Sequence, residues 1–206
     1  MAGGRRIETP FGAVFSSNLT PDVRTGLGAW NTQDFWQALH HGRSKDGRLL
    51  TPAFPYNHTS VITRADSDDL LAWLQSLPPV DQPAQPHTLI WPVGTQAALA
   101  VWRTLFFSPS PFKPDPTQSA EWNRGAYLVQ GLGHCAACHS PRNALGASGA
   151  VDDLSGGLMP MVNWYAPDLG RDSETGLAST PLADTVQLLR TGQSRQAQTS
   201  GPMAEV

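Results

Sequence analysis

The chain contains only two cysteines among its 206 residues, and they lie three positions apart. A disulfide framework needs more cysteines, and so does a zinc or iron–sulfur centre held by four thiolates, so the count excludes both. A histidine follows the second cysteine at once, in the run Cys135-Ala136-Ala137-Cys138-His139. With 19 glycines and 18 prolines, the rest of the chain is typical of loop-rich domains held together by something besides a large apolar core.

Cys-x-x-Cys-His is the attachment signature of c-type haem. Two thiols one helical turn apart can add to the two vinyl groups of one porphyrin, and His139 then lies beneath the iron as its proximal ligand. A thiol redox pair would instead want a βαβ setting, which the sequence does not indicate. A zinc site would need two further ligands, and His134 and His139 are badly placed to chelate beside their own cysteines. The motif therefore favours haem.

Composition narrows the function further. The net charge is -3 and only 15% of residues are charged, so no basic excess points to nucleic acid. Seven tryptophans and 40% hydrophobic residues argue against disorder. The first six residues lack the apolar segment of a signal peptide. The most apolar stretch, 97–107, is far shorter than the ~20 residues that span a bilayer, and it predicts a packed helix.

An internal duplication organises the chain. A shift of 150 positions matches 11 of the 34 residues between 19 and 52 without a gap, where chance would give about two. The matched pairs are Leu19 with Leu169, Asp22 with Asp172, Thr25 with Thr175, Gly26 with Gly176, Leu27 with Leu177, Asp34 with Asp184, Gln37 with Gln187, Leu39 with Leu189, Gly42 with Gly192, Ser44 with Ser194 and Pro52 with Pro202. We interpret this as two copies of one domain.

Proline-rich segments set the expected boundaries of the copies. The first copy covers 1–77, a connector with a short apolar helix covers 78–118, and the second copy covers 119–206. Apolar spacing and capping residues predict helices over 32–41, 65–77, 122–131 and 184–189, with Thr180-Pro181 starting the last and Gly42 and Gly192 as stops. No β alternation is sustained. The predicted fold is mostly α, with tandem cytochrome-c-like domains, long loops and an incomplete first domain.

An electron-carrying haem usually takes a sixth ligand, and methionine is the choice that also raises the potential. Met159 and Met161 lie close after the motif, which leaves little chain to cross the porphyrin. Met203 follows 64 residues after His139, in the turn Gly201-Pro202-Met203, so its loop is long enough to reach the far face. Met203 is the predicted axial ligand, and core packing is the ordinary alternative for each methionine.

The residues around the motif carry a resemblance. Segments 123–129 and 133–143 resemble the middle domain of the three-haem cytochrome c subunits of bacterial membrane-bound dehydrogenases. That family includes the alcohol and gluconate dehydrogenase cytochromes and those paired with molybdenum hydroxylases of the nicotinate and isoquinoline type. Segments 3–12 and 16–22 resemble the first domain just after its haem motif, and 52–56 and 119–123 look most like the molybdenum-hydroxylase branch. The similarity covers essentially the whole chain.

Departures from the family define what the first copy lacks. With the offset of 150, its cysteine motif would begin at 135 − 150 = −15, before Met1, and the family's third haem domain is missing. The resemblance therefore implies an internal fragment of a longer protein. Ala53 and Phe54 align with Met203, and His58 follows, either as distal ligand of the missing first haem or as a loop histidine. The remaining histidines, His40, His41 and His87, are expected to be solvated.

The resemblance also implies function and location. It implies electron transfer from a catalytic dehydrogenase subunit toward quinone or a terminal oxidase, with one haem c in this chain and three in a full-length, membrane-associated protein. It implies the periplasmic face of the cytoplasmic membrane, with the signal peptide removed by truncation. Arg124 and Arg142 are candidates to pair with haem propionates, and exposed salt bridges are the equal alternative. Rival classes are a haem protein with an open sixth site, as in sensors and peroxidases, and a zinc-binding module.

Overall fold

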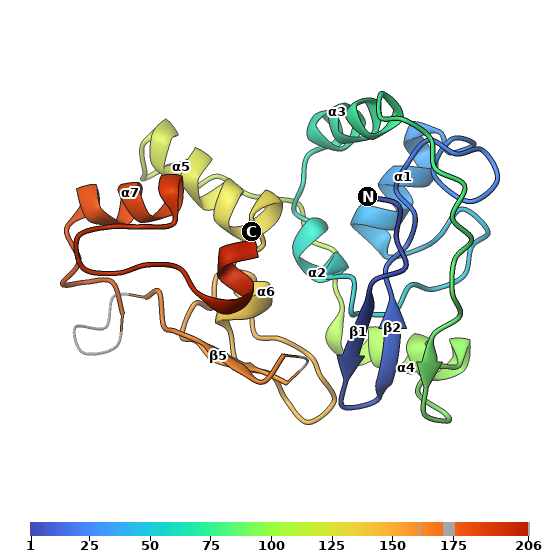
Figure 1. Ribbon diagram of the computed structural model, residues 1–206. Helices are drawn as coiled ribbons and strands as arrows, with labels where there is room; N and C mark the ends of the chain where they lie inside the picture. Colours follow the sequence, from blue (N-terminus) through green and yellow to red (C-terminus); the bar gives the residue numbers. More distant parts are fainter. Residues whose placement is uncertain (161, 171–175, 206) are drawn as a thin grey trace.

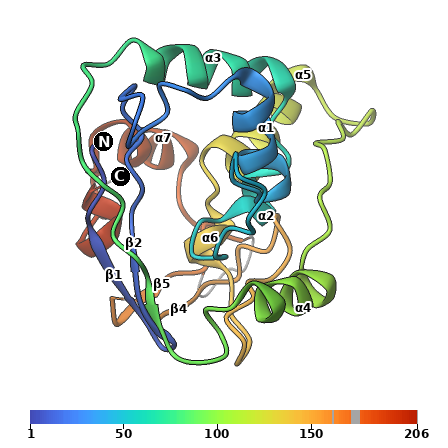
Figure 2. The same cartoon turned by 90° about the vertical axis from the view of Figure 1, so that its right-hand side faces the viewer.

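The computed structural model describes residues 1–160, 162–170 and 176–205, and the path of the chain is helical with small sheets (Figures 1 and 2). The helices are α1 (Thr32–His41), α2 (Tyr56–Thr59), α3 (Arg64–Gln75), α4 (Gln96–Phe106), α5 (Ala120–Tyr127), α6 (Ala136–His139) and α7 (Leu182–Thr191), with a π-helical turn η1 (Leu128–Leu132) and a 3-10 turn η2 (Gly201–Glu205). The strands are β1 (Arg6–Thr9), β2 (Gly12–Phe15), β3 (Thr88–Leu89), β4 (Gly157–Met159) and β5 (Trp164–Ala166). Among the described residues, no helix is both long and apolar enough to cross a membrane.

Helix α1 has the ends that the sequence predicts. Asn31 and Asp34 form a reciprocal capping box at its start, and Gly42 ends it in the left-handed conformation at φ 56°. Helix α7 ends in the same way at Gly192, with φ 72°, but its N-cap position is Pro181 and not the predicted Thr180. The predicted helix 122–131 is also corrected, because α5 ends at Tyr127 and continues as the π-helical turn η1.

The principal apolar core lies where α1 packs against α3. Its buried members are Leu27, Phe35, Leu39, Leu71 and Leu74. The duplication partners Leu39 and Leu189 differ sharply here, because Leu39 is 8% exposed and Leu189 is 71% exposed. Leu39 lies in the cluster that α3 completes, whereas no described helix packs on α7 in that way. Identical residues at matched positions thus meet different surroundings.

Two small antiparallel sheets were not predicted. One contains β1, β2 and β3, and the other is the β4–β5 hairpin, in which Met159 pairs with Trp164. No described strand exceeds four residues, so an alternating pattern is too short to stand out in the sequence. The expectation of a solvated His40 is wrong as well. Its ring is 9% exposed and stacks on Trp36 with ring centroids 4.4 Å apart.

Backbone hydrogen bonds repeat at the same offset as the sequence identities. Four pairs of bonds correspond residue for residue, and each lies near the start or the end of α1 or α7. They are Leu27 N to Thr20 O with Leu177 N to Gly170 O, Trp30 N to Leu27 O with Thr180 N to Leu177 O, Phe35 N to Asn31 O with Thr185 N to Pro181 O, and Gly42 N to Ala38 O with Gly192 N to Leu188 O. The two segments therefore share local geometry as well as residues.

Candidate haem-attachment site

The segment before the cysteines is an α-helix that continues as a wider π-helical turn. Ser119 caps α5 by accepting a hydrogen bond from the Trp122 amide, and α5 then passes into the π-helical turn η1. Cys135 returns to that turn, because its amide donates to the Val129 carbonyl over 3.0 Å. His134 takes a positive φ of 37° between the two, which turns the chain into α6. Local backbone bonding therefore fixes where the motif begins.

Helix α6 holds the motif as a single helical turn. The His139 amide donates to the Cys135 carbonyl over 2.9 Å, and Cys135 and Cys138 are free, partly exposed thiols. Ala136 is fully buried beneath the turn, where a larger side chain would not fit. The Ser140 hydroxyl donates to the Ala136 carbonyl over 2.7 Å and closes the turn. This geometry places both sulfurs within one turn of each other, as addition to one porphyrin requires.

The orientation of His139 is set by a residue 28 positions further along the chain. Its Nδ1 lies 2.7 Å from the Pro167 carbonyl oxygen, and the ring is 8% exposed. A carbonyl can only accept, so Nδ1 carries the proton and Nε2 keeps a free lone pair, as a ligand to iron needs. The β4–β5 hairpin delivers Pro167, and the Gly156 amide donates to the His139 carbonyl over 2.8 Å. The residues present therefore fit a covalently attached haem.

Gly157 lets the hairpin approach this turn closely, and its replacement gives a first prediction. A β-carbon at Gly157 would lie 2.3 Å from the Ser140 carbonyl oxygen, which is backbone and cannot rotate away. We expect Gly157→Ala to lower the free energy of unfolding by about 1–3 kcal/mol and to reduce haem incorporation. Urea denaturation and haem content per chain would measure this.

Gly125→Ala is the matched control for that substitution. Gly125 lies in α5, and a β-carbon there meets nothing within 4 Å. Alanine at this helical position should raise stability by about 0.5–1 kcal/mol and leave haem content unchanged. Equal behaviour of the two variants would contradict the close approach of the hairpin.

Cys135 is not poised for redox exchange. Burial raises the pKa of the Cys135 thiol, and the neighbouring Cys138 adds to the increase. A catalytic dithiol depends on a depressed pKa of one thiol, and this environment favours the neutral form of Cys135 instead. Within the described part of the chain, histidine, cysteine and acidic side chains do not gather in groups of three or more that could hold a metal ion. Neither the redox nor the zinc interpretation gains support.

Comparisons with known proteins agree with the motif. Over the whole chain it is 44% identical to a nicotinate dehydrogenase subunit of Pseudomonas putida and 40% identical to the cytochrome c subunit of a quinone-linked alcohol dehydrogenase of Gluconacetobacter polyoxogenes. A diheme c-type cytochrome of Cereibacter sphaeroides is 39% identical over 91% of the chain and 69% of its own length. The chain is a member of the cytochrome c subunit family of dehydrogenases.

The relatives named as cytochrome c subunits are electron-transfer subunits of dehydrogenases and not catalytic chains. No family model matches the sequence. The cytochrome spans 17% of the length of the nicotinate relative and 45% of the alcohol dehydrogenase relative. The identities over the whole chain confirm the resemblance that the residues around the motif indicated.

The candidate sixth ligands of the cytochrome lie in different surroundings. Met203 is 42% exposed in η2 and lines a cavity of about 460 Å³ together with the C-terminal half of α7. Met159 is 7% exposed and is held in the β4–β5 hairpin opposite Trp164. Met161 lies outside the described residues. The η2 turn overlaps α6 in the view of Figure 1 but is clear of it in the view of Figure 2, so the two elements lie apart.

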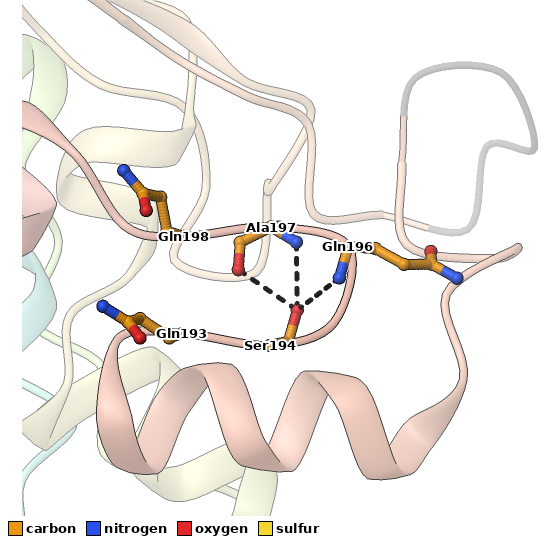
Figure 3. Close-up of a pocket in the computed structure, with 5 residues that line it drawn as sticks. All are labelled: Gln193, Ser194, Gln196, Ala197 and Gln198. Carbon is orange, nitrogen blue, oxygen red and sulfur yellow. Dashed lines mark hydrogen bonds between the residues drawn. The ribbon is translucent and has the colours of Figure 1, made fainter.

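A smaller hollow of about 300 Å³ adjoins that cavity, in the turn that follows α7 (Figure 3). It is lined by Gln193, Ser194, Gln196, Ala197 and Gln198. The Ser194 hydroxyl is the centre of the turn, since it donates to the Ala197 carbonyl and accepts from two backbone amides. The polar groups of this hollow hold the turn in shape and are distant in sequence from the cysteines.

His58 is not a solvated loop histidine, because it is 1% exposed. Its Nε2 lies 3.3 Å from the Ser148 hydroxyl, which also accepts from the Asn57 amide over 2.9 Å, while its Nδ1 is buried without a hydrogen-bond partner. Burial lowers the pKa of His58 to about 4, with smaller effects of His134 and Arg142. His58 thus joins the first segment to the loop that follows the haem motif.

The two arginines differ in their relation to the motif. Arg142 donates to the Ala137 carbonyl inside the motif, and its Nη1 is buried without a partner. Arg124 lies 3.9 Å from Asp66, and its guanidinium is over the Tyr127 ring. Arg142 is therefore beside the candidate site, whereas Arg124 takes part in the contact between α5 and the start of α3.

Two groups of the site were not predicted from the sequence, namely the Pro167 carbonyl and the Ser148 hydroxyl. No local sequence signal marks either of them.

Proposed function

We propose that this chain carries electrons on one haem c bound through Cys135 and Cys138, with His139 as proximal ligand. The observation that supports this most directly is the bond from His139 Nδ1 to the Pro167 carbonyl, because it leaves Nε2 as the only ring nitrogen able to coordinate. Haem bound there supplies an iron that alternates between two oxidation states. The chain holds His139 in one orientation in both oxidation states, which keeps the structural rearrangement on electron transfer small.

Met203 is our proposed sixth ligand. It lines a cavity, whereas Met159 is already packed in a hairpin, and a thioether placed on a long loop can reach across a porphyrin face. An axial thioether favours the reduced iron and closes the coordination sphere against small ligands. This supports an electron carrier over the alternative with an open sixth site.

The two similar segments are, in this proposal, tandem cytochrome-c-like domains. The first covers 1–77 without a haem motif, the connector covers 78–118, and the second covers 119–206. The hydrogen bonds that repeat at an offset of 150 support a common origin. His58 is a candidate ligand of a first haem in a longer protein, because burial keeps its imidazole neutral, as ligation requires.

Haem stoichiometry tests this division of the chain. We expect the 206-residue polypeptide to have the mass of one covalent haem, because only one pair of cysteines is present. His58→Ala should leave that mass and the spectrum of the attached haem unchanged. A mass corresponding to two haems would contradict the proposal. Three haems in the full-length protein remain our expectation, although the Cereibacter relative is named a diheme cytochrome.

The proposed partner is a catalytic dehydrogenase subunit, and the proposed acceptor is quinone or a terminal oxidase on the periplasmic side of the membrane. The names of relatives that are subunits of nicotinate and quinone-linked alcohol dehydrogenases support the catalytic partner. The test is one absorption experiment on the purified protein. Dithionite should produce the sharp bands of reduced haem c, and a catalytic subunit with its substrate should produce the same change. Absence of visible bands would overturn the haem assignment.

A further inference from the structure

Helix α4 is apolar on the side that faces away from the protein. Its exposed positions fall at helical spacing and form what we name the outer stripe, which consists of Ala97, Ala100, Val101, Thr104 and Leu105. Val101 is 62% exposed and Leu105 is 64% exposed. A surface helix normally turns charged residues to water, so this arrangement is inverted. Figures 1 and 2 show α4 near the lower edge of the molecule, away from α3 and α5.

Contacts on the inner side of α4 fix the helix in an orientation that leaves the outer stripe exposed. Its only charged residue, Arg103, donates to the His41 carbonyl over 2.6 Å and lies over the rings of Tyr56 and Phe107. The Trp102 indole donates to the Leu145 carbonyl over 2.9 Å, and Leu99 is 5% exposed. These inward contacts fix the rotation of the helix about its axis, and the stripe stays outside.

Other exposed apolar side chains lie near α4. Leu145, which is 54% exposed, lies beside α4 through its bond with Trp102. The turn before the helix exposes 56% of Ile90 and 87% of Trp91. The outer stripe offers no free side-chain donor, because its only polar group, the Thr104 hydroxyl, donates to the Ala100 carbonyl. Protein interfaces usually carry about one hydrogen bond per 100–200 Å², and the stripe itself is poorer in hydrogen-bonding side chains than that.

Charge favours a lipid surface over a protein. Residues 82–114 contain no aspartate or glutamate, and their only lysine and arginine are Lys113 and Arg103. Nothing in the segment repels anionic headgroups, and exposed tryptophan is characteristic of membrane–water interfaces. An 11-residue helix is too short to span, so it would lie in the plane of the interface. We propose that the outer stripe, with Leu145, Ile90 and Trp91, rests on the surface of a phospholipid bilayer.

The test uses purified, haem-loaded protein and sedimentation with vesicles of phosphatidylcholine alone or with roughly a third of phosphatidylglycerol. We expect binding to both, stronger to the anionic vesicles. Val101→Glu with Leu105→Glu should lower the partition into vesicles roughly tenfold or more, because two apolar side chains that enter the bilayer become charged. The matched control is Val23→Glu, since Val23 is 73% exposed outside this surface. Val101→Ala with Leu105→Ala should give a smaller fall with the least disturbance of folding.

The haem absorption spectrum of each variant separates this inference from the proposed function, because lipid binding and haem attachment use different residues. An unchanged spectrum with lost vesicle binding supports the inference. Equal binding of the glutamate variant and the unchanged protein would overturn it, and so would absence of binding by the unchanged protein. Loss of binding to a catalytic dehydrogenase subunit with vesicle binding intact would also overturn it, since the stripe would then be a protein interface.

Discussion

Replacing both Cys135 and Cys138 by alanine is expected to abolish covalent attachment of haem completely. Each thiol contributes one thioether bond, so haem in the double variant could be held only by axial ligation, which denaturant removes. The measurement is haem retention through denaturing electrophoresis, followed by staining for haem. Helix α6 should survive the change, because alanine is a strong helix former and neither cysteine side chain takes part in the bonds that close the turn.

The single variants are the controls for this experiment. Cys135→Ala or Cys138→Ala leaves one thiol, so each should retain haem by one thioether in reduced yield. Haem that stays on the double variant after denaturation would show attachment elsewhere in the chain. That outcome would refute the assignment of the motif.

Met203→Ala is expected to change the electronic properties of the attached haem without detaching it. Loss of an axial thioether should remove the weak far-red band of the oxidised protein and allow carbon monoxide to bind the reduced form. The reduction potential should fall by roughly a tenth of a volt or more, within the ~0.8 V range that axial ligands span. Spectra and redox titration measure these changes, and both are made on the haem-loaded protein.

Met159→Leu is the matched control for Met203→Ala. Met159 is 7% exposed in the β4–β5 hairpin, and leucine nearly conserves its volume. The control should therefore keep the far-red band and the potential. If Met203→Ala changes neither, another residue is the sixth ligand, and Met159 and Met161 are the next to be substituted.

The sequence alone predicted much of this chain, because the decisive signals are local. Five consecutive residues indicate haem attachment, since the spacing of thiols along one helical turn is a property of the backbone itself. The helix over 32–41 and its stop at Gly42 were predicted from local signals of the same kind, and α1 has these bounds. The duplication was also visible, because it compares residues along the chain and needs no knowledge of how the chain folds.

Only the tertiary structure decided how distant segments complete the site. The Pro167 carbonyl that orients His139 is a backbone group, and any residue could have supplied it. The burial of His58 depends on contact with Ser148, 90 positions away. Leu39 and Leu189 occupy matched positions, yet only Leu39 is buried, because α3 packs over it. Contacts between segments far apart in sequence arise from packing of the whole chain, and packing leaves no pattern within a short stretch of residues.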